Sequence, residues 1–230
     1  LRVWGDGAWD YGPNNPNQAA YSISVSRYRE GTSGGDVLST DGASSYLQVD
    51  ELAGLGGNDK LTGTERAEKF DGGDGNDTIE AGAGDDVLKG GAGNDLLKGE
   101  GGNDTFVVVG ESGAADTFVG GAGTDTLRVE GDSDLSKSSF DSVEQLQGTG
   151  TNRVYLSTAQ IAGFTRADNV ILSGTNQSFA NLAGNYILEG TSGNDVLIAG
   201  DGDNVLRPFA GNNTVSGGAG NDTVVWERGW

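Results

Sequence analysis

Acidic residues recur along this chain at nine-residue intervals, and their carboxylates are its most chemically capable side chains. They occupy the sixth position of a unit that can be written G-G-x-G-x-D-x-U-x, in which U is a large apolar residue. The unit is complete in residues 72–79, 90–97, 120–127 and 217–224, and misses one glycine in 54–61, 81–88, 99–106 and 190–197. Carboxylates can pair for acid–base catalysis or bind hard cations such as calcium. Acidic pairs are so common here that their presence alone does not favour catalysis.

The composition excludes several other chemistries. The 230-residue chain has no cysteine and no histidine, which excludes disulfides, thiolate chemistry and histidine-liganded zinc. Its 34 acidic against 14 basic residues give a net charge of −20, so nucleic acid is not an expected partner. No apolar run approaches the roughly 18 residues of a membrane span. The chain begins at Leu1 rather than methionine and shows no signal peptide, so we expect a piece of a longer protein.

The elements that must position the carboxylates follow from the apolar position U. Only the three residues x-U-x are expected to be extended, and the other six, rich in glycine, must turn the chain. Two units facing opposite ways make one coil, and stacked coils set U against U in a thin core. The U positions are Leu52, Leu61, Phe70, Ile79, Leu88, Leu97 and Phe106, then Phe118 and Leu127, and Leu197, Leu206, Val215 and Val224.

Stacking of coils aligns every second acidic residue. Asp59, Asp77 and Asp95 share one edge, and Asp86 and Asp104 share the other. Bare carboxylates on strands about 4.8 Å apart repel each other. A hard divalent cation held by carboxylates and turn carbonyls makes the interaction attractive. The sequence therefore predicts an all-β solenoid with calcium-binding turns.

The repeated segments GGDGNDTIE, GGAGNDLLK, GGAGTDTLR and GGAGNDTVV resemble the nonapeptides of RTX (repeats-in-toxin) proteins. The resemblance covers residues 54–128 and 190–225, and several adjacent units are a specific signal. It implies a parallel β-roll with calcium in each turn. It also implies type I secretion from a Gram-negative bacterium in a largely unfolded state, followed by folding in extracellular calcium.

The predicted metal-binding residues are the turn glycines and the sixth-position aspartates. They are Asp59, Gly72, Gly73, Gly75, Asp77, Gly82, Gly84, Asp86, Gly90, Gly91, Gly93, Asp95, Gly99, Gly102, Asp104, Asp116, Gly120, Gly121, Gly123, Asp125, Asp195, Gly217, Gly218, Gly220 and Asp222. Glu68 lies in GTERAEKF, which lacks most turn glycines, so that site is expected to be incomplete. Asn204 and Asn213 replace aspartate, so we expect two or fewer good sites in the second array.

Four regions are predicted. Residues 1–49 are expected to be a β-rich cap or the end of a preceding domain. A surface whose aromatic residues stack on sugars is the alternative for this region. Residues 50–128 are the first array, whose register slips by three residues at Val108–Gly110. Residues 129–189 are a calcium-poor solenoid bridge of longer coils, with a short helix at Ser157–Ala162, or else an independent small β domain. Residues 190–230 are the second array, ending in an aromatic cap with Trp226 and Trp230.

Two alternatives for the repeat are weaker. A flexible glycine-rich linker has no reason to place a large apolar residue at each ninth position. A metal-free solenoid leaves the aspartate columns unexplained.

The predicted function is a non-catalytic calcium-binding module of a secreted or cell-surface bacterial protein, in an adhesin, surface layer or matrix. The alternative is the C-terminal folding and secretion module of an exported protease, lipase, or polysaccharide epimerase or lyase. Catalysis within these residues is not expected. Calcium ions are the expected partners. Binding to cell-surface polysaccharide and self-assembly are further interactions that the sequence leaves open.

Overall fold

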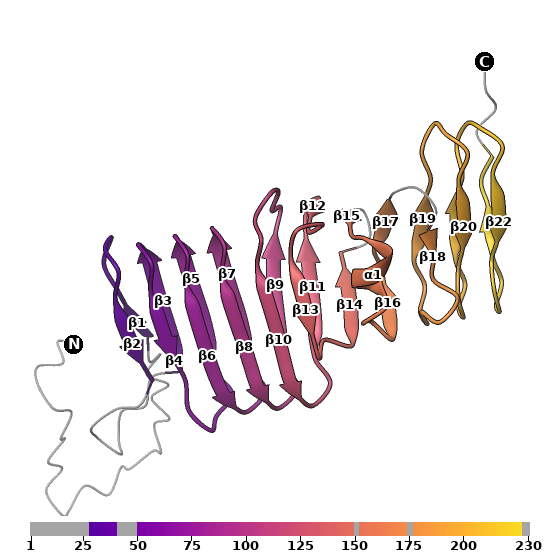
Figure 1. The fold of residues 1–230 in the computed structure, drawn as a ribbon. Coiled ribbons are helices and arrows are strands. Elements are labelled where there is room, and N and C mark those ends of the chain that lie inside the picture. Colours follow the sequence, from indigo (N-terminus) through magenta and orange to yellow (C-terminus); the bar gives the residue numbers. More distant parts are fainter. Residues whose placement is uncertain (1–27, 41–49, 150–151, 174–176, 227–230) are drawn as a thin grey trace, which may run out of the picture.

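The structure, a computed structural model, describes residues 28–40, 50–149, 152–173 and 177–226. Nearly all regular structure in these ranges is parallel β-strand, stacked coil upon coil into a solenoid (Figure 1). The predicted all-β solenoid is therefore confirmed. No helix among the described residues is both long and apolar enough to span a membrane.

Within the described ranges, four sheets form the faces of the solenoid. Sheet I contains β1 (Tyr28–Glu30), β3 (Glu51–Gly56), β5 (Lys69–Asp74), β7 (Val87–Ala92), β9 (Thr105–Val109), β11 (Thr126–Glu130), β14 (Gln145–Gly148) and β16 (Arg166–Asp168). Sheet II contains β2 (Val37–Ser39), β4 (Lys60–Thr62), β6 (Thr78–Ala83), β8 (Leu96–Gly101), β10 (Thr117–Ala122) and β13 (Ser139–Asp141). Sheet III contains β12 (Ser133–Asp134), β15 (Arg153–Tyr155), β17 (Ile171–Ser173), β19 (Ile187–Glu189), β21 (Val205–Arg207) and β23 (Thr223–Val224). Sheet IV contains β18 (Gln177–Ser178), β20 (Val196–Ile198) and β22 (Thr214–Ser216).

The strands of the first array are longer than the sequence predicted. Strands β5 to β8 each have six residues, because pairing continues through the glycines that follow x-U-x. Gly73 pairs with both Leu55 and Gly91, so stacked turns of equal length keep the ladder in register. The prediction that only three residues are extended is wrong for this array. It holds in the second array, where β20, β21 and β22 have three residues each.

The thin core consists of the predicted U residues. Leu61, Ile79 and Leu88 have no exposed surface, and the register pairs Leu61 with Ile79 across neighbouring coils. Toward the bridge the core contains neighbouring phenylalanine rings, with centroid distances of 5.6 Å (Phe106–Phe118) and 5.2 Å (Phe118–Phe140). These residues form one continuous core cluster through both arrays and the bridge.

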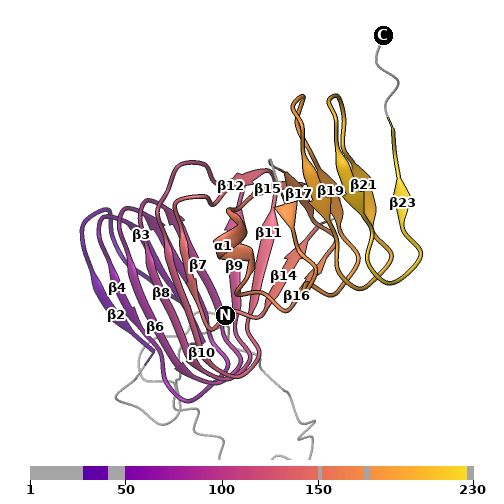
Figure 2. The same cartoon turned by 45° about the vertical axis from the view of Figure 1, so that its right-hand side comes forward.

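The three-residue slip adds a third side to the solenoid. Strand β9 runs on to Val109, so the extra residues lie in the following turn rather than at Val108–Gly110. There Ser112 bridges to Asp134, at the point where sheet III begins. In the bridge a coil can therefore carry three strands, one each from sheets I, III and II, such as β11, β12 and β13. The second array returns to two sides, built on sheets III and IV (Figure 2).

The bridge is a continuation of the solenoid, with the predicted short helix at α1 (Thr158–Ile161). Its coils are not uniformly longer. Thr165 bonds Glu144 across a step of 21 residues, whereas Ser173 bonds Glu189 across 16. The division into four regions stays a prediction.

The solenoid already includes part of the predicted N-terminal cap. Strand β2 pairs with β4, with Leu38 opposite Leu61, so residues 31–39 (GTSGGDVLS) form an early repeat. Trp4, Trp9, Tyr11 and Tyr21 lie outside the described residues, as does Trp230.

Candidate metal centre

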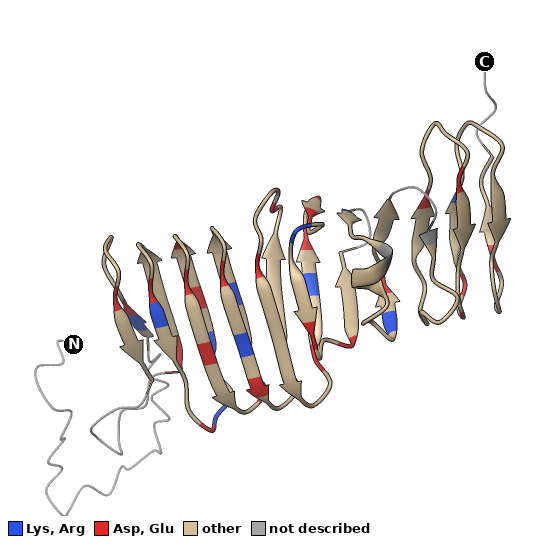
Figure 3. Cartoon of the chain, in the orientation of Figure 1, with Lys and Arg blue, Asp and Glu red and all other residues tan. Residues whose placement is uncertain are grey.

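The sixth-position carboxylates stack in two columns along the edges of the solenoid, and Figure 3 shows acidic residues gathered at its turns and strand ends. Asp59 N–H donates to Asp77 Oδ1 at 2.8 Å, and Asp77 N–H donates to Asp95 Oδ1 at 2.8 Å. Each link spans one coil of 18 residues, as predicted. The first column contains Asp36, Asp59, Asp77, Asp95 and Asp116, and the second contains Glu68, Asp86, Asp104, Asp125 and Glu144.

The second oxygen of most of these carboxylates is buried without a hydrogen-bond partner. Among the described residues this holds for Oδ2 of Asp59, Asp77, Asp86, Asp95, Asp104 and Asp125. Native proteins rarely leave buried polar atoms unpaired, because each costs about 1–3 kcal/mol and charged groups cost more. A carboxylate oxygen can only accept, so its missing partner is a proton donor or a cation.

In several turns a main-chain oxygen lies beside the unpaired carboxylate oxygen, and a glycine makes room for both. A Cβ added to Gly72 would lie 2.3 Å from Asp77 Oδ2 and 2.5 Å from the Gly90 carbonyl oxygen of the next coil. Gly54 and Gly120 stand in the same relation to Asp59 and Asp125. Two kinds of acceptor therefore converge on a space that no side chain can enter, which is the donor set that calcium prefers.

The glycines at the second and fourth turn positions have a different role. Gly73 and Gly75 have φ of +108° and +131°, in the region that residues with side chains rarely adopt. These angles turn the main chain so that successive coils approach closely.

The unpaired carboxyls are poorly suited to carry charge in the folded chain without a cation. Burial raises the pKa of Asp86 to about 7, and the neighbouring Asp104 and Glu68 add to the effect. Burial also raises the pKa of Asp95 and of Asp104 to about 6, with help from the next carboxylate in each column. A bound cation would reverse this preference, because it favours the charged form.

The inserted turn changes one position of the first column. It forms a cavity of about 540 Å³ lined by residues that include Glu111, Gly90 and Asp116. Burial, and then the nearby Asp116, raise the pKa of Glu111 to about 8. Glu111 was not foreseen, because an insertion interrupts the repeat on which the prediction depended.

The structure thus places the predicted aspartates of the first array in two ladders, and in the turns of Asp59, Asp77 and Asp125 it sets one carboxylate beside a carbonyl of the next coil. No group of three or more acidic, histidine or cysteine side chains in metal-binding geometry occurs in the described ranges. In the second array, Asp195 is buried but bonded to Thr191, and Asp222 accepts a bond from Asn204 N–H at 3.0 Å.

Comparisons with known proteins agree with this geometry. A family model described as RTX calcium-binding nonapeptide repeat matches four copies, at residues 71–106, 112–135, 184–207 and 189–224. The comparison with curated proteins found no match. The chain therefore carries RTX calcium-binding nonapeptide repeats, folded as a parallel β-roll.

Proposed function

We propose that the first array binds calcium ions between successive turns, and that this binding drives its folding in a secreted or cell-surface protein. The unpaired, buried Oδ2 atoms of the two columns carry the proposal. Extracellular calcium modules bind with dissociation constants of about 10⁻⁴–10⁻³ M, a range that would keep the array unfolded inside a cell and folded outside it.

In this proposal the two carboxylate oxygens of each aspartate have different roles. One oxygen holds the neighbouring coil by accepting its N–H, as Asp77 does for Asp59. The other oxygen faces the space beside glycine and the carbonyl of the next coil, as Asp77 does toward Gly90. When bound there, calcium would supply the positive charge that offsets the repulsion between stacked carboxylates.

Without the ion, folding of the array is opposed by two costs. Its turns are rich in glycine, which loses more conformational entropy on ordering than other residues. Its carboxylates must also be buried without partners. Because unfolded chains lack the assembled turns, the free energy of ion binding becomes free energy of folding.

Circular dichroism and calorimetry on the purified chain test this function. We expect a large gain of β signal and several bound ions when EGTA is replaced by millimolar calcium, with magnesium much less effective because it requires tighter octahedral geometry. A spectrum that is fully β-like in EGTA and unchanged by calcium would sink the proposal.

The parent protein is proposed to be structural, an adhesin or surface protein, because two repeat arrays are joined by a strand-rich bridge with one continuous core. The predicted alternative, a folding module of an exported enzyme, predicts the same calcium response. Activity assays of the full-length parent separate the two.

A further inference from the structure

In some turns of this β-roll, donors of the same turn form hydrogen bonds with the sixth-position carboxylate. These turns differ from those in which one carboxylate oxygen has no partner. Among the described turns with an acid at the sixth position, three begin with Gly-Thr rather than Gly-Gly: residues 31–36, 63–68 and 190–195. In each, the threonine main-chain N–H donates to the acid of the same turn. The distances are 2.6 Å from Thr32 to Asp36, 2.7 Å from Thr64 to Glu68, and 2.7 Å from Thr191 to Asp195.

The threonine hydroxyl adds a second donor to the same carboxylate. Thr64 Oγ1 lies 2.8 Å from Glu68 Oε1, and Thr191 Oγ1 lies 3.2 Å from Asp195 Oδ2. None of Asp36, Glu68 and Asp195 is among the carboxylates with a buried, unpaired oxygen in the described part of the chain. Two protein donors thus fill the role that a cation would otherwise have.

The main-chain conformation at the second turn position separates the two kinds of turn. In turns with an unpaired oxygen this residue has positive φ, even where it is Leu55 (76°) or Glu100 (72°). Thr32, Thr64 and Thr191 at the same position do not have positive φ, as expected for β-branched residues, which rarely adopt it. The residue at this position therefore selects whether its N–H faces the carboxylate.

A second substitution has a similar effect at the sixth position. Asn213 keeps the ladder bond, since its Oδ1 accepts from Asp195 N–H at 2.8 Å. Its Nδ2 donates to carbonyl oxygens of its own turn, at 3.0 Å from Pro208 and 3.2 Å from Ala210. Asn204 does the same with Gly202 at 3.2 Å. The amide group bonds the turn carbonyls that a cation would otherwise hold.

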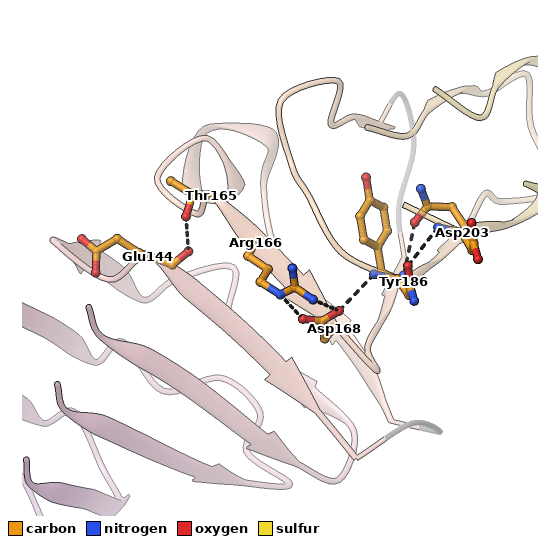
Figure 4. A network of polar contacts seen from close by, with 8 residues as sticks. Glu144, Thr165, Arg166, Asp168, Tyr186 and Asp203 are labelled. Atoms are coloured by element: carbon orange, nitrogen blue, oxygen red, sulfur yellow. Dashed lines mark hydrogen bonds and ion pairs between the residues drawn. The ribbon is translucent and has the colours of Figure 1, made fainter. Parts of the chain in front are cut away.

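The second array is also tied to the bridge by bonds that need no ion. Tyr186 lies one coil before Asn204, and its main-chain N–H donates to Asn204 Oδ1. The buried Tyr186 hydroxyl accepts a hydrogen bond from Gly200 N–H at 2.8 Å. On the outer edge, Asp168 accepts from Asn185 N–H, and Asn185 in turn accepts from Asp203 N–H at 2.9 Å (Figure 4).

We propose that the residues at the second and sixth positions decide which turns take a cation, so that the bridge and the second array as far as Asn213 fold without calcium. The first array and the last turn, which has Gly218 (φ +88°) at its second position and Asp222 at its sixth, require it. This rests on the proposed function of the first array. The bridge and the second array as far as Asn213 then form a preformed end against which the first array assembles when calcium arrives.

Hydrogen–deuterium exchange of the whole chain, in EGTA and in calcium, tests the partition. We expect amides in 186–207 to be protected in both conditions, and amides in 69–127 to be protected only with calcium. Equal dependence of both segments on calcium would overturn the partition while leaving the proposed function standing. Protection of 69–127 in EGTA would overturn both.

A pair of matched variants tests the residue code. Asn213→Asp removes the amide and creates an unpaired carboxylate, so exchange in the second array should become on the order of tenfold faster in EGTA and recover in calcium. Asn194→Asp makes the same charge change at an exposed outer position and should show no calcium dependence. Identical behaviour of the two variants would contradict the code.

Discussion

At the scale of the residue, the first glycine of a turn leaves room beside the carboxylate, as Gly72 does for Asp77, although Ala81 occupies this position in the turn of Asp86. Gly72 is not in the left-handed region, so its main-chain angle is not what excludes other residues. The exclusion is steric, because a Cβ there would meet both Asp77 Oδ2 and the Gly90 carbonyl oxygen. The third position of the unit differs from the first in that it tolerates a side chain, because Ala83, Ala92 and Ala122 occupy it in other turns.

Gly72→Ala should therefore cost one calcium ion and about 1–3 kcal/mol of the free energy of unfolding in calcium, the usual cost of overpacking a site. Isothermal titration calorimetry and urea unfolding measure the two quantities. The control is Gly101→Ala, where an added Cβ would have only a contact at 4.0 Å. If Gly72→Ala binds as many ions as the control, the glycine is not part of a binding site.

At the scale of the element, a buried acid clamps three strands of sheet III. Glu189 in β19 is 3% exposed, and its oxygens accept from Arg153 Nε at 2.8 Å and from an Arg207 guanidinium nitrogen at 2.9 Å. Burial alone would raise the pKa of Glu189, but the two arginines outweigh it and hold the pKa below its usual value. The clamp joins the bridge to the second array across 36 residues of sequence.

Glu189→Gln should lower the free energy of unfolding of the bridge and second array by about 1–2 kcal/mol, a reduced value because both arginines are partly exposed. Urea denaturation should show the same loss in EGTA as in calcium, since no cation takes part. Lys89→Gln, which breaks the exposed Lys89–Asp71 pair, is the control and should change stability by less than about 0.5 kcal/mol. A loss for Glu189→Gln that appears only in EGTA would contradict a metal-free clamp.

At the scale of the whole molecule, charge sets the conditions for folding. The chain carries a net charge of −20, and the first array buries carboxyls whose pKa values lie above the ordinary 3.8. In the absence of calcium the folded array therefore binds protons more readily than the unfolded chain does. Protons and calcium are alternative partners for the same oxygens.

In EGTA, acidification from pH 8 to pH 5 should increase the order of the first array. The stabilisation from Asp86, Asp95 and Asp104 is complete below the ordinary pKa of 3.8 and is lost as pH rises through about 6 and 7. In calcium the sign reverses, because protons compete with the ion and weaken its binding. Circular dichroism against pH, with and without calcium, measures both trends, and a β signal in EGTA that rises with pH would contradict the assignment.

The sequence by itself determined the features that repeat. The nine-residue spacing of Leu61, Ile79 and Leu88 fixed the coil and its core, and the same spacing placed Asp59, Asp77 and Asp95 in one column, because each coil stacks only on its neighbours. Only the tertiary structure decided which of these carboxylates lack a partner, since that depends on the peptide orientation at the second turn position. It also decided the features that break the period: the third side that starts where Ser112 meets Asp134, and the Glu189 clamp. The Ser112–Asp134 contact starts in an inserted turn, and Arg153 of the clamp lies in the bridge, where the glycine–aspartate unit is absent, so the repeat carries no signal for either.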